Sequence, residues 1–354
     1  MNPLASRFPD LDTALPLISL TQLPTRLCAA TKFGAQLNLD NVLIKRDDLS
    51  AEPYGGNKVR KLDYLIADAV NKRCDSIVTF GAVGSNHALA TAIYARQQGL
   101  NCYAVLTDQP FTPYVAPTLR YHAHLGTVLI HANGYYESIR AAEELEASHP
   151  SGSESVYRIP WGGSSWLGVA AFVNAALELT TQLGDADAPE RIYVACGTMG
   201  TAVGLAMGLR VAKWPTRVIA VQVVPQPVTS IANFENLFAA TNRELRNRDY
   251  RFPIFDNPMS NVDLRTEFLG DGYAMSTPEC DDAVNLIAET ESLTLETTYT
   301  GKALAALIRD ARAGDLRGGP VVFWNTCNGR PYPADLSPIL PNEVPEPFRL
   351  YLAD

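Results

Sequence analysis

Apolar runs that suit strands alternate with stretches that suit helices along most of this chain. Continuous apolar strands between helices are typical of parallel sheets covered on both faces. Two such clusters, near residues 76–130 and 191–224, predict an α/β fold with two open, twisted, mostly parallel sheets, each flanked by helices. The expected strands are 76–80, 101–106, 127–130, 191–195, 217–224 and 319–324, and the expected helices are 57–69, 87–98, 117–125 and 202–212.

The two clusters also suggest two domains. We expect a large domain of residues 1–58 plus 170–354 and a small domain of residues 59–169. The stretch 147–155 is rich in serine, proline and glutamate and is expected to be a surface loop. The stretch 225–262 contains several asparagines and prolines and is expected to be irregular.

A glycine turn followed by a lysine at residues 55–58 is the most informative local pattern. Gly55 and Gly56 let the backbone pass close to another group, and the helical spacing of the following apolar residues places Lys58 at a helix start. The positive end of the helix dipole disfavours the ammonium form there, and a Schiff-base lysine needs such a depressed pKa. A solvated lysine in a basic cluster with Arg60 and Lys61 is the alternative.

Three polar or glycine-rich turns, at residues 81–87, 196–201 and 325–329, follow predicted strands. Ligands gather at the carboxyl ends of strands in open parallel sheets. The second turn has the composition of a phosphate cradle before a helix, although a tight capped turn fits equally well. Its spacing is wrong for a nucleotide-binding P-loop or a dinucleotide site. With a lysine like Lys58, the economical explanation is pyridoxal phosphate, a cofactor with one phosphate and one aldehyde.

Composition and charge exclude several other functions. The chain has 354 residues, of which 47% are hydrophobic. Its net charge of −9 argues against nucleic acid as the main partner. We expect no membrane span and no secretory signal. The six scattered cysteines have no CxxC spacing, so that neither a metal site nor a redox pair is expected, and reduced thiols suggest a cytoplasmic location.

The motifs at residues 55–62, 84–87, 197–201 and 299–303 resemble, in this order, those of the D-cysteine desulfhydrase and 1-aminocyclopropane-1-carboxylate deaminase family. Residues 44–49 and 160–164 also fit, and the resemblance runs from about residue 23 to residue 326. These are fold type II pyridoxal phosphate enzymes of the tryptophan synthase β superfamily. The resemblance implies a cofactor between the two domains, a small amino-acid substrate and a homodimer.

The resemblance also implies a role for particular residues. Lys58 binds the cofactor covalently and Asn86 hydrogen-bonds its ring oxygen. A core position is the alternative for Tyr299, and loop packing is the alternative for Tyr273. The expected catalytic residues are Lys58, Ser85, Tyr273 and Tyr299. The expected cofactor-binding residues are Asn57, Lys58, Asn86, Gly197, Thr198, Met199, Gly200, Thr201, Thr300 and Thr326. The expected substrate-binding residues are Ser85, Asn86, His87, Tyr273 and Tyr299.

Two threonines favour one branch of this family. The deaminases have an acid where this chain has Thr300 and a leucine where it has Thr326. The expected reaction is therefore α,β-elimination on a small β-substituted amino acid, as in D-cysteine desulfhydrase, giving pyruvate, ammonia and sulfide. The last motif, 325–330, departs from the family pattern, and Gly84 stands where glutamine is frequent. Alternatives are the ring-opening deaminase, an L-cysteate-type sulfo-lyase that uses Arg330, and a cofactor-binding protein without turnover.

Overall fold

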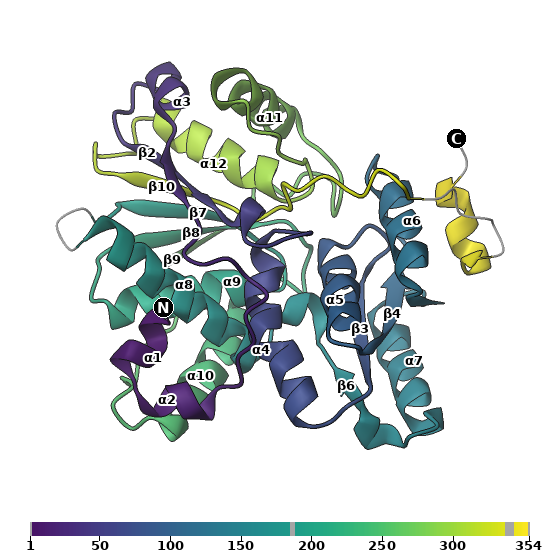
Figure 1. Cartoon of the computed structure of the whole chain (residues 1–354). Coiled ribbons are helices and arrows are strands. Elements are labelled where there is room, and N and C mark those ends of the chain that lie inside the picture. The colour runs from purple at the N-terminus through teal and green to yellow at the C-terminus, as the bar shows by residue number, and fades with distance from the viewer. Residues whose placement is uncertain (1, 185–187, 337–342, 353–354) are drawn as a thin grey trace.

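The computed structural model describes residues 2–184, 188–336 and 343–352, which form two sheets with helices on their faces (Figure 1). This arrangement confirms the fold class predicted from the sequence. The larger sheet has the strand order β1-β2-β10-β7-β8-β9, and all of its pairs except β1 with β2 are parallel. Its strands are β1 (Leu27–Ala29), β2 (Val42–Arg46), β7 (Arg191–Cys196), β8 (Arg217–Gln222), β9 (Val262–Arg265) and β10 (Val321–Asn325).

Helices cover both faces of the larger sheet. Alternate residues of each buried strand point to opposite faces, so that both faces are apolar and need this cover. Val322 and Trp324 pack in the core beneath α8 and α9, whereas Val321 and Phe323 pack against α12. Figure 1 shows α8–α10 on one side of this sheet and α3, α11 and α12 on the other. These helices are α3 (Thr31–Gln36), α8 (Trp166–Leu183), α9 (Gly200–Val211), α10 (Ile231–Arg248), α11 (Pro278–Glu291) and α12 (Thr300–Arg312).

The smaller sheet has the order β5-β4-β3-β6, and its three strand pairs are parallel. Its strands all lie within the expected small domain, although the domain boundaries themselves stay a prediction. The strands are β3 (Ser76–Ala82), β4 (Asn101–Thr107), β5 (Val128–His131) and β6 (Val156–Arg158). The neighbouring helices are α4 (Asn57–Asn71), α5 (Asn86–Gln97), α6 (Val115–Leu125) and α7 (Tyr135–Ser148), and the chain starts with α1 (Pro3–Arg7) and α2 (Asp10–Ala14).

The prediction that residues 225–262 are irregular is wrong, because α10 occupies much of this stretch. Ser230 caps the helix by accepting a hydrogen bond from the backbone N–H of Asn233. Phe234, Phe238 and Leu245 recur at helical spacing and are fully buried. Burial of this apolar face stabilises the helix despite the asparagines that weaken its intrinsic propensity.

A network of four buried charges lies beneath the N-terminal half of α4. Arg60 donates to Asp47 (2.8 Å) and to Glu178 of α8 (2.9 Å), and Lys45 of β2 lies 2.5 Å from the same Glu178 carboxylate. Trp324 of β10 also donates to Asp47, at 2.8 Å. Two cations and two anions balance within this network, which joins α4, α8, β2 and β10.

The C-terminal part of the chain crosses from the larger sheet to the smaller one (Figure 1). After β10, the Tyr332 ring contacts those of Tyr54 and Tyr121, and its hydroxyl lies 3.1 Å from that of Thr118. The last described helix, η6 (Glu346–Leu352), buries Phe348 beside α6. We call residues 331–352, where described, the C-terminal strap.

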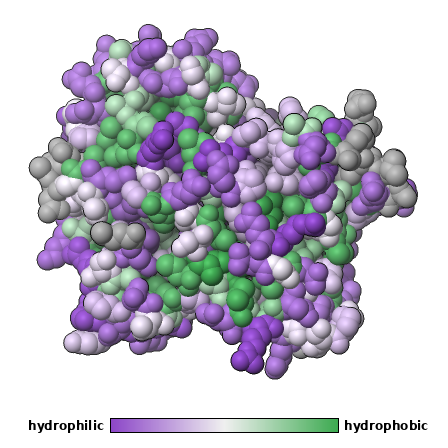
Figure 2. Space-filling model, viewed as in Figure 1, coloured by the Kyte–Doolittle hydropathy of each residue, from purple (hydrophilic) through white to green (hydrophobic). Residues whose placement is uncertain are grey.

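Hydrophilic and hydrophobic residues are mixed over the face that Figure 2 shows. Among the described residues, no helix is long and apolar enough to cross a membrane. Nor do three potential metal-ligating side chains come together anywhere in that part of the chain.

Candidate functional site

A cavity of about 280 Å³ lies between the two sheets, where the ends of β3, β7 and β10 face the starts of α4, α5 and α9. Most residues predicted for the site line this cavity, and they come from six separate parts of the sequence. Those that do so are Asn57, Lys58, Ser85, Asn86, His87, Gly197, Thr198, Met199, Gly200, Thr201, Tyr273, Tyr299 and Thr326.

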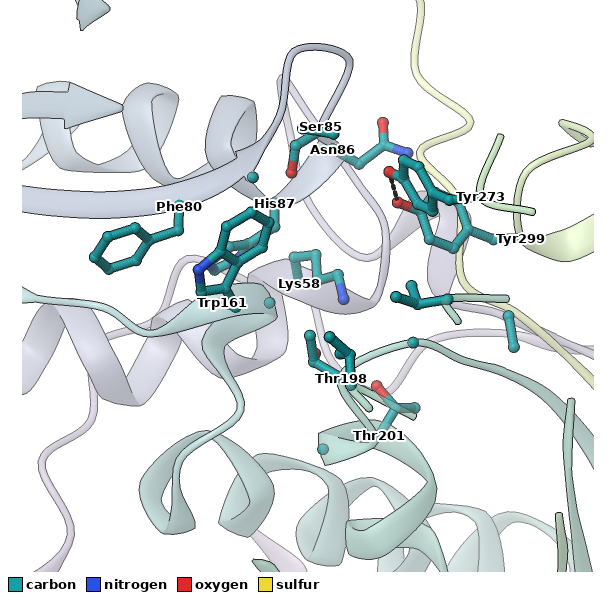
Figure 3. A pocket seen from close by; sticks show the side chains of 18 of the residues that line it. Lys58, Phe80, Ser85, Asn86, His87, Trp161, Thr198, Thr201, Tyr273 and Tyr299 are labelled. Atoms are coloured by element: carbon teal, nitrogen blue, oxygen red, sulfur yellow. Dashed lines mark hydrogen bonds between the residues drawn. The ribbon is translucent and has the colours of Figure 1, made fainter. Parts of the chain in front are cut away.

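Lys58 lies in the first turn of α4, and its side chain extends into the cavity (Figure 3). Gly56 precedes it with a φ of 95°, and a Cβ there would lie 3.1 Å from the backbone oxygen of Thr326. This turn therefore needs glycine both for its backbone angle and for its close contact with the end of β10. Burial lowers the pKa of Lys58 to about 8. The direction is the one that the sequence predicted, with burial rather than the helix dipole as the main cause.

The turn between β7 and α9 forms a cradle of hydrogen-bond donors. Met199 adopts a left-handed backbone conformation, and Gly200 opens α9. A Cβ on Gly200 would lie 2.6 Å from Ser164 Oγ and 2.7 Å from Lys61 Nζ, so that these side chains need the glycine. The hydroxyl of Thr198 lies 2.8 Å from that of Ser164. Hydroxyls, an amine and the start of a helix are the donors that a phosphate group prefers.

Lys61 belongs to this cradle rather than to a solvated basic cluster. It is buried, lines the cavity and donates from Nζ to the backbone oxygen of Gly162 (2.9 Å) and to Ser164 (3.2 Å). Burial and the neighbouring charge of Lys58 lower the pKa of Lys61 well below its ordinary value. Two neighbouring amines in one cavity favour an anionic ligand, because its charge relieves their desolvation and their mutual repulsion.

Asn86 presents its amide N–H₂ group toward the cavity. The hydroxyl of Tyr54 donates to Asn86 Oδ1 at 2.6 Å, and Nδ2 faces the Sγ of Cys327 at 3.8 Å. Nδ2 donates one N–H to Cys327 Sγ, so that its second N–H can donate to an acceptor on a ligand. On the opposite side, Asn57 Nδ2 donates to Thr201 at 2.9 Å and joins the start of α4 to that of α9.

Ser85 and His87 flank Asn86 at the start of α5. Ser85 caps the helix by accepting from the N–H of Ala88 at 3.2 Å, and His87 Nε2 lies 3.2 Å from the Thr79 hydroxyl. Burial, with the nearby charges of Lys58 and Lys61, lowers the pKa of His87 well below its ordinary value. His87 is therefore neutral at physiological pH and contributes a hydrogen-bonding group rather than a charge.

Tyr273 and Tyr299 lie together on the far side of Lys58 from Trp161 (Figure 3). Their hydroxyls share a short hydrogen bond. Burial raises the pKa of Tyr273 to about 12, although the bond with Tyr299 lowers it. The pKa of Tyr299 lies well above its ordinary value, mainly because of burial and its neighbour Tyr273. The pair can thus hold a proton at the cavity and pass it between two oxygens.

Two residues that the sequence singled out do not line this cavity. Thr300 is buried and its hydroxyl donates to Glu296 at 2.8 Å. Arg330 forms an ion pair with Glu52 (2.7 Å) and donates to the backbone oxygen of Ala51. Arg330 therefore contacts the loop before Lys58, and its role toward a substrate stays a prediction.

Sequence reasoning gave no role to several residues that shape the site. Lys61 could have been found from its spacing. It lies three residues after Lys58 on the same predicted helix, and residues three apart share a helix face. Tyr54, Ser164 and Gln109 act through tertiary contacts that a single sequence does not encode. The side-chain oxygen of Gln109 accepts from the N–H of Gly84 at 3.0 Å, so that the Gln109 amide fills the space beside this glycine.

Comparisons with known proteins agree with this geometry. Residues 18–326 match the family model described as pyridoxal-phosphate dependent enzyme. The solved structure of an ACC deaminase homologue is 27% identical, covers 93% of this chain and 96% of its own, and has a TM-score of 0.80. An L-serine ammonia-lyase from the fungus Rhizomucor miehei is 23% identical over 88% and 96% of the two chains, with a TM-score of 0.60. Threonine deaminase isoform 2 from Solanum lycopersicum is 15% identical over 92% and 89%, with a TM-score of 0.63.

Proposed function

The chain belongs to the family of pyridoxal-phosphate dependent enzymes, and from this membership we propose that it is a lyase that catalyses α,β-elimination on a β-substituted amino acid. Its cofactor is pyridoxal 5′-phosphate. D-cysteine is the first candidate substrate, with pyruvate, ammonia and sulfide as products. The donor cradle, the Lys58 amine in the cavity and the second amide N–H of Asn86 fit the phosphate, the aldehyde and the ring oxygen of this cofactor.

Each part of the site has a distinct task in this proposal. Lys58 would hold the cofactor covalently, Lys61 and residues 197–201 would hold its phosphate, and Asn86 would donate to its ring oxygen. When bound, pyridoxal phosphate withdraws electrons from the substrate α-carbon and so makes the α-proton acidic. Ser85 and the N–H groups at the start of α5 would bind the substrate carboxylate.

The α-proton needs a base that is neutral near physiological pH. The pKa of Lys58, lowered to about 8, makes its amine suitable once it is free. Tyr273 and Tyr299 would serve as a proton reservoir on the opposite side, where the hydrogen bond between them lets one phenol stabilise the other's charge.

The surroundings of Thr300 are the observation that favours elimination over ring opening. The Glu296 carboxylate accepts from the backbone N–H groups of Thr298 (2.6 Å), Tyr299 (2.9 Å) and Thr300 (2.7 Å), and from the Thr300 hydroxyl. This acid is therefore committed to the start of α12. Asp108 is the one carboxylate among the described residues that line the cavity. Without an acid at a ring nitrogen the electron sink is weaker, which suffices for a good leaving group.

Product analysis tests the proposed function directly. The purified holoenzyme is given D-cysteine, L-cysteine, cysteate or 1-aminocyclopropane-1-carboxylate, and each keto acid is identified. We expect pyruvate and sulfide from cysteine. The structural likeness to an ACC deaminase homologue favours the ring-opening deaminase as second candidate, and a four-carbon keto acid from the cyclopropane would establish it instead. If the cofactor binds but none of these compounds reacts, the elimination on cysteine is refuted.

We expect Lys61→Ala to weaken binding of pyridoxal phosphate about 10- to 100-fold, because a charge-assisted hydrogen bond to the phosphate is lost. Titration of the apoprotein, followed by absorbance, measures this dissociation constant. Pyridoxal, which lacks the phosphate, provides the control and should bind both proteins equally. An equal loss for pyridoxal would place the effect on the fold rather than on the phosphate.

We expect Tyr299→Phe to lower kcat about 10²- to 10⁴-fold with little change in cofactor affinity, since the proton reservoir loses one oxygen. Steady-state kinetics of pyruvate release and a cofactor titration measure the two quantities. Tyr193→Phe is the matched control, because Tyr193 is a buried tyrosine whose hydroxyl donates to Asp310 (2.7 Å) on α12, away from the cavity. An unchanged kcat in Tyr299→Phe would remove the tyrosine pair from the mechanism.

A further inference from the structure

The cavity extends beyond the cofactor site into an aromatic extension formed by Phe80, Trp161 and Tyr135. These residues come from the end of β3, from the turn after β6 and from the start of α7. The Phe80 and Trp161 rings stack with centroids 6.1 Å apart and planes at 14°, and Tyr135 lies 6.3 Å from Trp161. Figure 3 places Trp161 between Phe80 and Lys58, on the side opposite Tyr273 and Tyr299.

The aromatic extension continues past the three rings. Thr107 and Asp108, at the end of β4, also line it, so that it reaches the carboxyl edge of the smaller sheet. The indole Nε1 of Trp161 is buried and has no hydrogen-bond partner among the described residues. This N–H group is closed off from the cavity, so that the extension offers a ligand the aromatic rings and not this donor.

We propose that the aromatic extension binds a flat aryl group on the β-substituent of the substrate, so that S-aryl cysteines are preferred over cysteine. This inference rests on the proposed lyase function and specifies its substrate class. Aromatic side chains stack on flat groups with offset or tilted geometry and bury a large apolar area. One polar group lies beside these rings, the carboxylate of Asp108, which is 2.9 Å from His131 Nε2.

The reaction on such a substrate balances without an oxidant or reductant. The α-proton is removed, the bond between Cβ and sulfur breaks, and its electron pair leaves with the sulfur. The sulfur takes up a proton and departs as an aryl thiol. The remaining three-carbon fragment takes up one water and yields pyruvate and ammonia. An aryl thiolate is a weak base and therefore a good leaving group, which suits the weaker electron sink of this site.

The test separates binding from turnover. Calorimetry with the holoenzyme compares phenylalanine with alanine, each in both enantiomers, because neither has a leaving group at Cβ. We expect phenylalanine to bind more tightly in the wild type, and Trp161→Ala or Tyr135→Ala to reduce this preference about tenfold. Trp161→Phe keeps a ring and should retain most of the preference. Tyr136→Ala is the matched control, since Tyr136 is the next residue on α7 and is 87% exposed.

Pyruvate formation from S-phenylcysteine and from cysteine then completes the test. A higher kcat/KM for S-phenylcysteine, lowered by Trp161→Ala and not by Tyr136→Ala, is the expected result. An equal preference for phenylalanine in wild type, Trp161→Ala and Tyr135→Ala would overturn the aryl site even if cysteine gives pyruvate. A ring-dependent preference without pyruvate from any substrate would support the aryl site and refute the lyase function.

Discussion

Replacing Lys58 by alanine should abolish turnover, with a loss of at least about 10³-fold, and remove the visible absorbance of the bound cofactor. No other amine can replace it, because Lys61, its nearest neighbour in the cavity, is held by Gly162 and Ser164. Absorbance spectra of the two purified proteins with added pyridoxal phosphate, and pyruvate release, measure both effects.

Lys72→Ala is the matched control, because Lys72 lies at the other end of α4 and is 60% exposed. This variant should keep the spectrum and the activity. The pKa of Lys58 adds a second readout, since only the neutral amine attacks an aldehyde. With a pKa of about 8, the rate of cofactor binding should rise with pH and level off above about 8. A rate that still climbs toward pH 10 would contradict the lowered pKa, and a Lys58→Ala protein with the full spectrum would refute the assignment.

We expect Glu178→Gln to lower the free energy of unfolding by about 3–5 kcal/mol, because it leaves Lys45 and Arg60 with one buried anion, Asp47. Chemical denaturation of the apoprotein measures this loss. Arg60 lies two residues after Lys58 on α4, so that cofactor affinity should fall as well. Asp263→Asn is the control, because the pair of Asp263 with Arg217 has side chains 40% and 44% exposed and should contribute less than about 1 kcal/mol.

The pH dependence of stability tests the same network. Burial alone would raise the pKa of Glu178, but the charges of Arg60 and Lys45 outweigh it and lower this pKa to about 2. A carboxylate with a depressed pKa stabilises the fold above its unfolded-state pKa near 4.5 and loses this contribution as the pH falls toward 2. The wild type should therefore lose stability more steeply than Glu178→Gln in this range. Parallel curves would mean that the charge of Glu178 contributes nothing.

The buried parallel strands could be predicted from the sequence, because each is a continuous apolar run between helical patterns. Strands β4, β7 and β8 differ from the expected ranges only at their ends. Helix α10 could not be predicted, because many polar residues interrupt the apolar pattern of the face that tertiary packing buries. The partner of each strand also remained unknown, since β10, last in sequence, pairs between β2 and β7.

The candidate site was predictable where the chemistry lies in contiguous motifs, as for Lys58 and the turn after β7. Residues that act across the fold were not. The Tyr54 hydroxyl orients Asn86 from 32 positions away, and Gln109 fills the space that Gly84 leaves from 25 positions away. Thr300 was expected at the cofactor, but its hydroxyl contacts Glu296, so that its direct role stays a prediction.

The C-terminal strap fixes how far the two halves of the molecule can separate. The chain leaves the larger sheet at the cavity residue Thr326, and the strap ends beside the smaller sheet, where the Tyr351 hydroxyl donates to the backbone oxygen of Gln109 at 2.9 Å. A chain segment cannot extend beyond about 3.3–3.6 Å per residue. Residues 328–331, between the cavity residue Cys327 and Tyr332, which contacts Thr118 and Tyr121 of α6, therefore limit how far the two sheets can separate. Shortening this segment would exclude bulky substrates without changing a single residue that touches them.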